Sequence, residues 1–121
     1  MKISIDLDGC LWHYQTFFRD LMSGMQAAGH QVGILTSHKF IHQPADRALL
    51  AARGFPEPDF YIGRLNGVVD YAACKVHFIL TLGIDLHFED RHFEKMRELL
   101  GADAYRVISV APRGAEEQHF E

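Results

Sequence analysis

Cysteine is scarce in this chain, and the sequence has neither a long apolar run nor an excess of positive charge. The two cysteines, Cys10 and Cys74, have neither the number nor the spacing of a disulfide framework or a CxxC metal site. No apolar stretch reaches the roughly 18 residues that a membrane span needs. The Met-Lys start runs directly into a strand pattern rather than a signal peptide. We therefore expect a protein of the reducing cytoplasm that does not contact a membrane.

The charge balance argues against another class of partner. Twelve Lys and Arg residues against sixteen Asp and Glu give a formal net charge of -4, so the chain lacks the overall basic field that holds nucleic-acid backbones. The net charge does not decide whether the surface has a local basic patch. The 48% hydrophobic and 23% charged content is ordinary for a globular protein. The 121 residues suit one domain over 1–121, with residues 111–121 expected to form a frayed polar tail.

The first strand pattern ends in two acidic residues. Apolar residues alternate along residues 3–7, Asp6 and Asp8 follow one residue apart, and Gly9 permits a sharp turn. Carboxylates are poor strand formers, and an unpaired buried charge is costly unless a metal or a partner offsets it. This pattern favours a functional site over a solvated turn, which is the alternative.

Helical and strand patterns then alternate to the end of the chain. Helical spacing predicts helices over residues 14–28, 44–53, 68–82 and 93–100, with a glycine after each. Strand patterns cover residues 31–37, 60–62, 84–88 and 105–110. Four β-α repeats followed by a last strand predict an α/β fold. We expect a doubly wound (Rossmann-like) five-stranded parallel sheet with helices on both faces.

In such sheets ligands bind at the carboxyl ends of the strands, near the point where strand order reverses. That rule selects polar residues after the first, second and fourth strands, and a lysine near the start of the third helix: Asp6, Asp8, Thr36, Ser37, Glu89, Asp90 and Lys75.

These residue types together match the needs of phosphoryl transfer. Asp6 would attack phosphorus, and Asp8 would act as general acid and then base if its pKa is raised. Magnesium prefers hard oxygen ligands, which Asp6, the Asp8 carbonyl and Asp90 would supply. The Thr36 hydroxyl and the positive charge of Lys75 would contact the phosphate oxygens.

The motifs resemble those of the haloacid dehalogenase-like (HAD) superfamily. The matching segments are an apolar strand with DxD at residues 3–9, a strand ending in Thr-Ser at 34–37, a lysine at 75, and Phe-Glu-Asp at 88–90. The resemblance implies Asp6 as nucleophile, Asp8 as acid and base, and Asp90 on magnesium. It also implies Thr36 and Lys75 on phosphate, and Ser37 is predicted beside them. Glu89 would contact the metal ligands without binding the metal itself. One departure is Cys10, which stands where the family usually has Thr or Val.

Members of this superfamily often carry an inserted cap domain, for which this sequence leaves no room. Only residues 63–67 separate the third strand from the following helix. A capless site excludes water from small substrates poorly. The resemblance therefore implies a magnesium-dependent phosphomonoesterase with an open site, acting on a nucleotide, a nucleic-acid end or a phosphoprotein. The sequence also leaves undecided whether a neighbouring subunit of a homo-oligomer covers the site.

Several other interpretations compete with this one. A catalytically silent phosphate-binding or partner-binding domain would have the same fold. A signalling receiver domain is disfavoured because the third strand ends without a carboxylate, and dehalogenation at carbon would not need Asp8. The local alternatives are that Glu89 and Asp90 only cap the fourth helix and that Lys75 is a solvated helix residue. Whether His38 and His42 bind zinc, and whether any histidine or Arg64 contacts substrate, stays open.

Overall fold

Five parallel strands form one sheet in the order β3-β2-β1-β4-β5, which confirms the predicted doubly wound α/β fold. The computed structural model describes residues 1–110, so the predicted polar tail lies outside the described residues. The strands are β1 (Lys2–Ile5), β2 (Gln31–Lys39), β3 (Tyr61–Arg64), β4 (Leu86–Glu89) and β5 (Val107–Ser109).

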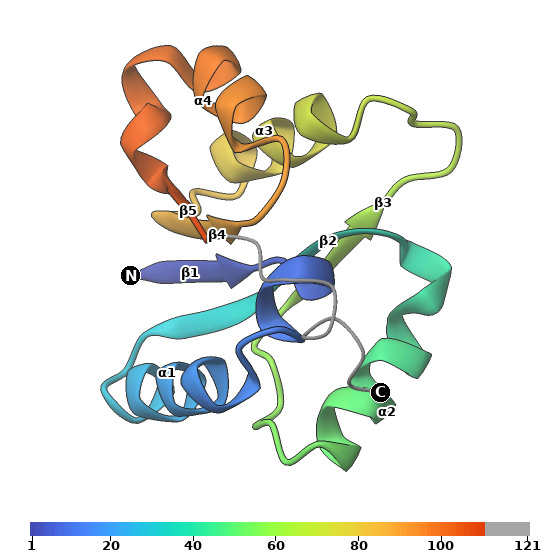
Figure 1. The fold of residues 1–121 in the computed structure, drawn as a ribbon, viewed down its shortest axis with the longest axis vertical. Helices are drawn as coiled ribbons and strands as arrows, with labels where there is room; N and C mark the ends of the chain where they lie inside the picture. The colour runs from blue at the N-terminus through green and yellow to red at the C-terminus, as the bar shows by residue number, and fades with distance from the viewer. Residues whose placement is uncertain (111–121) are drawn as a thin grey trace.

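The helices lie on both faces of this sheet, as Figure 1 shows. They are α1 (Gln15–Ala27), α2 (Gln43–Ala52), α3 (Tyr71–Thr81) and α4 (Phe93–Leu100). From β1 the chain winds outward to β2 and β3, and from β3 it returns to β4 and β5 on the other side of β1. Because crossover connections are right-handed, this reversal puts α1 and α2 on one face and α3 and α4 on the other. The reversal itself lies between β1 and β4.

Two apolar cores flank the sheet because successive strand residues point to opposite faces. Ile34 joins the core under α1 and α2, where Phe18 and Met22 are buried. Its neighbour Leu35 joins the core under α3 and α4, with Ile79 and Met96. Both faces of the central strands are therefore buried, and a polar side chain at the end of such a strand enters a partly dry environment.

The third helix begins later than its apolar pattern predicts. It begins at Tyr71 because the Asp70 side chain accepts a hydrogen bond from the backbone N–H of Ala73, at 3.0 Å, and so caps the first turn. Val69 lies inside the predicted helix over residues 68–82, but in the structure it precedes the helix and is 86% exposed. Helix capping thus overrides the apolar pattern here.

The last strand is also shorter than predicted. Residues Gly101–Arg106 form 3₁₀ turns, and β5 begins only at Val107. Arg106 stabilises these turns, since its side chain bonds to Asp103 at 3.0 Å and to the Ile84 carbonyl at 3.1 Å. Among residues 1–110, no helix has both the length and the apolar character needed to cross a membrane.

Candidate active site at the carboxyl edge of the sheet

The chain turns sharply after β1 and thereby brings two strand ends together. The Asp6 N–H still bonds to the Phe88 carbonyl of β4, at 3.1 Å, so the ends of β1 and β4 are held side by side. Gly9 follows with a φ of +74°, and a Cβ built there would lie 1.8 Å from the Asp90 carboxylate. Only glycine allows the turn over Leu7–Leu11 to pass this close to Asp90.

Three carboxylates converge at this edge: Asp6, Glu89 and Asp90. One oxygen from each lies within 4.8 Å of the others, and the three residues are only 1–8% exposed. The Asp90 Oδ1 atom is buried without a hydrogen-bond partner among the described residues. Because an unsatisfied buried carboxylate oxygen is costly, this atom favours a bound cation, and hard oxygens at this spacing suit magnesium.

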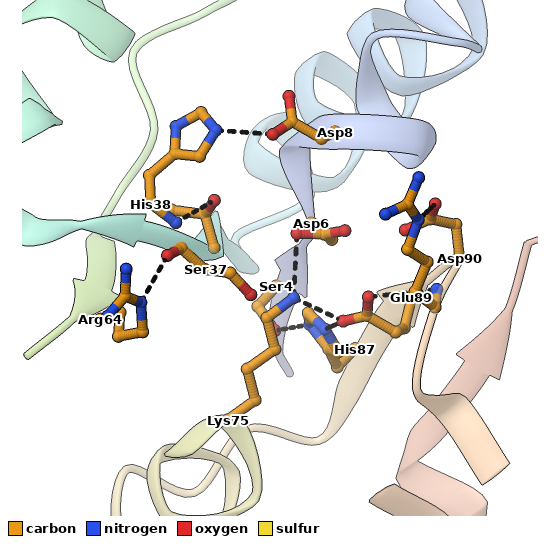
Figure 2. A network of polar contacts seen from close by, with 12 residues as sticks. Ser4, Asp6, Asp8, Ser37, His38, Arg64, Lys75, His87, Glu89 and Asp90 are labelled. Atoms are coloured by element: carbon orange, nitrogen blue, oxygen red, sulfur yellow. Dashed lines mark hydrogen bonds and ion pairs between the residues drawn. The ribbon is translucent and has the colours of Figure 1, made fainter. Parts of the chain in front are cut away.

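Lys75 extends from α3 into the same cluster, as Figure 2 shows. Its Nζ donates to Asp6 Oδ1 at 2.9 Å and to Glu89 Oε1 at 2.7 Å. The residue is 4% exposed, so the alternative of a solvated helix lysine is wrong. The ammonium group of Lys75 is thus shared by two carboxylates, one just after β1 and one at the end of β4.

Burial and charge act in opposite directions on these groups. Burial raises the pKa of Asp6 well above the ordinary aspartate range, although Lys75 opposes the shift. Burial would raise the pKa of Glu89 too, but the hydrogen bond from His87 and the charge of Lys75 outweigh it and lower that pKa to about 2. For Lys75, the two carboxylates overcome the effect of burial and raise the pKa. Asp6 and Glu89 together therefore keep Lys75 charged.

A buried polar chain behind the cluster was missed by sequence reasoning. His87 Nε2 contacts Glu89 Oε1 at 2.8 Å, and His87 Nδ1 contacts Ser4 Oγ at 2.7 Å. Burial lowers the pKa of His87, which favours the neutral ring that donates to Glu89 and accepts from Ser4. The sequence does contain an indication of this contact, because Ser4 and His87 are polar residues inside strand patterns. In the structure they are register partners in β1 and β4.

Asp8 points away from the acidic cluster toward β2. Its Oδ2 lies 2.7 Å from His38 Nε2, and His38 Nδ1 lies 2.9 Å from Asp46 Oδ2, which also accepts a hydrogen bond from the Tyr61 hydroxyl. The bond to Asp8 raises the pKa of His38 to about 9, although burial opposes it, and the same bond lowers the pKa of Asp8. The raised pKa that an acid role for Asp8 required is therefore absent. The ring between Asp8 and Asp46 carries the proton instead.

The residues selected from the sequence line a single cavity of about 390 Å³. Its lining includes all seven of them: Asp6, Asp8, Thr36, Ser37, Lys75, Glu89 and Asp90. Sequence reasoning had left His38, which also lines it, without a role. The Thr36 hydroxyl accepts a hydrogen bond from the His38 N–H at 3.1 Å, so it also stabilises the local turn.

Two local alternatives do not fit this geometry. Helix α4 has His92 at its N-cap position and no side-chain cap, so Glu89 and Asp90 do not cap it. His38 and His42 stand with ring centroids 6.5 Å apart, and in residues 1–110 the only group of three or more ligands at metal-binding spacing is the acidic one. The zinc interpretation thus has no support in the described part of the chain.

Comparison of the chain with protein-family models, with curated proteins and with solved structures found no match.

Proposed function

We propose that this protein is a magnesium-dependent phosphomonoesterase that works through an aspartyl phosphate on Asp6. The observation that carries the proposal is the buried cluster of Asp6, Glu89 and Asp90 around Lys75, with Asp90 Oδ1 unpartnered. A cluster that existed only for stability would not leave a buried carboxylate oxygen unsatisfied. The motif resemblance to the HAD superfamily, which no comparison tests, points to the same chemistry.

In the proposed reaction an Asp6 carboxylate oxygen forms a bond to phosphorus while the bond between phosphorus and the leaving alcohol oxygen breaks. That oxygen takes a proton from the hydrogen-bonded pair of His38 and Asp8. Water then attacks the aspartyl phosphate and gives its proton back to the pair, which releases inorganic phosphate and restores Asp6. Lys75, Thr36 and Ser37 would stabilise the charge on the transferred phosphoryl group.

Asp6 and Asp90 would hold the magnesium ion, together with the Asp8 carbonyl. When bound, the ion would reduce the repulsion between the acidic cluster and the incoming phosphate. Glu89 is a poorer candidate ligand, because its Oε1 already accepts from Lys75 and from His87. Its proposed role is to orient Lys75.

Exposed side chains lie at the rim of the cavity, since Asp8 and Arg91 are 72% and 78% exposed. Only the short loop over residues 65–70 separates β3 from α3. An open cavity favours a substrate that is large enough to cover the site itself, such as a nucleotide, a nucleic-acid end or a phosphoprotein.

The test is a phosphatase screen over phosphomonoesters, nucleotides, phosphopeptides and phosphorylated DNA ends, with magnesium or with a chelator. We expect activity only with magnesium, and a loss of about a thousandfold or more in kcat for Asp6→Asn. The matched control is Asp20→Asn, which removes an exposed carboxylate on α1 and should retain activity. Rapid acid quenching should trap a phosphoryl group on the wild type but not on Asp6→Asn.

Equal activity of the wild type and Asp6→Asn would remove Asp6 as nucleophile. Absence of activity on the whole panel, with retained binding of phosphate esters, would favour the catalytically silent binding domain.

A further inference from the structure

A second cavity of about 450 Å³ adjoins the acidic one. Ser37 and His38 line both cavities, so these two residues form the boundary between them. Five residues line the far side of the second cavity: Lys39 at the end of β2, His42 after it, Arg64 at the end of β3, and Ala45 and Asp46 of α2. The proposed mechanism assigns no role to this space.

The charge of the second cavity is opposite to that of the first. Lys39 and Arg64 are register partners on neighbouring parallel strands, and neither forms an ion pair with a carboxylate among the described residues. Asp46, the acidic residue of the lining, is already bonded to His38 and Tyr61. The two positive charges at this cavity therefore have no counter-charge among the described residues, and an anionic ligand could supply one.

Arg64 is held in a fixed orientation, as Figure 2 shows for its bond to Ser37. Its Nε donates to the Ser37 carbonyl at 3.0 Å, one terminal nitrogen donates to the Val68 carbonyl at 2.7 Å, and the guanidinium stacks on Tyr71 at 4.7 Å. The other terminal nitrogen has no recorded partner within residues 1–110. A guanidinium that is already ordered loses little entropy when it binds an anion.

The direction of the leaving group connects the two cavities. In phosphoryl transfer the attacking and leaving oxygens lie roughly in line on opposite sides of phosphorus. With Asp6 as the attacking group, the leaving alcohol lies on the side of phosphorus away from Asp6. Ser37 and His38 form the boundary between the two cavities, so an alcohol that extends past this boundary reaches Lys39 and Arg64 in the second cavity.

We propose that the second cavity binds a further phosphate carried by the leaving alcohol, so that the preferred substrate is a phosphomonoester with a second phosphate. Lys39 and Arg64 are the binding residues. This inference rests on the proposed function, because it takes Asp6 as the attacking group.

The experiment compares adenosine 3′,5′-bisphosphate with adenosine 5′-monophosphate. Whichever phosphate of the bisphosphate is transferred, the leaving alcohol carries the other. We expect the wild type to prefer the bisphosphate by about tenfold or more in kcat/KM, mainly through KM, as one charge-assisted contact would give. Lys39→Met and Arg64→Gln should each reduce this preference several-fold. Lys39→Met should leave hydrolysis of the monophosphate unchanged, since Lys39 has no role in the reaction itself.

Two controls separate charge at this position from charge in general. Lys39→Arg should keep the preference. Lys2→Met removes a lysine at the opposite edge of the sheet, where its Nζ bonds to the Leu82 carbonyl, and should also keep it. Equal kcat/KM for the two nucleotides in the wild type would overturn the inference, as would an unchanged preference in Lys39→Met.

If the wild type hydrolyses neither nucleotide, calorimetric binding tests the second cavity alone, and the proposed function fails only if the rest of the phosphomonoester panel is not hydrolysed either. Tighter binding of the bisphosphate that depends on Lys39 would then support the cavity as a phosphate site, and equal binding of the two nucleotides would reject it.

Discussion

At position 9 the backbone adopts a φ of +74°, and the space where a side chain would begin is occupied by Asp90. The residue therefore controls how close the turn after β1 approaches the end of β4. Asp90 also contributes the unpartnered oxygen of the acidic cluster. A single methyl group at this position would displace the Asp90 carboxylate that the proposed magnesium ion needs.

Gly9→Ala should consequently abolish magnesium binding. Saturating magnesium should raise the thermal unfolding midpoint of the wild type by roughly 5 °C or more, and should not raise that of the variant. Gly83→Ala is the control, because Gly83 also has a positive φ, of +66°, but a Cβ there would meet nothing within 4 Å. Both variants should lose about 1–2 kcal/mol to the left-handed backbone. A normal magnesium response in Gly9→Ala would contradict this role of the glycine.

Among the secondary-structure elements, α3 is bound to the sheet by more than apolar packing. Lys75 extends from it to Asp6 at the end of β1 and to Glu89 at the end of β4, and all three residues are nearly fully buried. Removal of one member of such a group leaves the remaining charges uncompensated, which costs more than the group contributes when intact.

Lys75→Met should lower the free energy of unfolding by about 3–5 kcal/mol, measured by urea denaturation in the presence of a chelator. Adding Glu89→Gln to the Lys75→Met variant should recover part of the lost free energy of unfolding, because it removes one of the two carboxylates left without a counter-charge. The combined loss should therefore be smaller than the sum of the single losses. In contrast, Lys75→Met and Asp103→Asn should add within about 0.5 kcal/mol, since Asp103 pairs with Arg106 and shares no partner with Lys75 among residues 1–110. Strict additivity of Lys75 and Glu89 would mean that the two side chains do not interact.

For the whole molecule, the bridge from Asp8 through His38 to Asp46 makes stability depend on pH. It joins the turn after β1 to β2 and α2, and it holds the pKa of His38 at about 9 rather than 6.5. Because the folded-state pKa is raised, the folded state binds the proton more tightly than the unfolded state. The stabilisation is complete below about pH 6.5 and is lost as the pH rises through 9.

Thermal unfolding of the wild type and His38→Gln at intervals from pH 6 to pH 10 tests this linkage. The difference in midpoint should be largest at the acid end and should shrink steadily toward pH 9. His77→Gln removes an exposed histidine on α3 and controls for general effects of the substitution. A difference that stays constant over this range would show that His38 does not gain its proton on folding.

Asp6 and Asp8 show which features of the candidate site the sequence predicts and which it does not. The acidic pair after a strand, and the lysine and second acidic pair later in the chain, were enough to select the residues of one cavity. They were not enough to show that Asp8 turns toward His38 while Asp6 turns toward Lys75. Which way a side chain at a strand end points depends on the partners that neighbouring strands provide.

The order of elements, the parallel sheet and the sheet edge that carries the acidic residues were determined by the sequence alone, because periodicity, glycine stops and right-handed crossovers act over short stretches. The tertiary structure decided the rest. It paired Lys75 with Asp6 across 69 positions and Ser4 with His87 across 83, and it set Lys39 opposite Arg64 beside the proposed site. Such contacts depend on strand register and on burial, which no local pattern specifies, because they arise only when distant segments pack against each other.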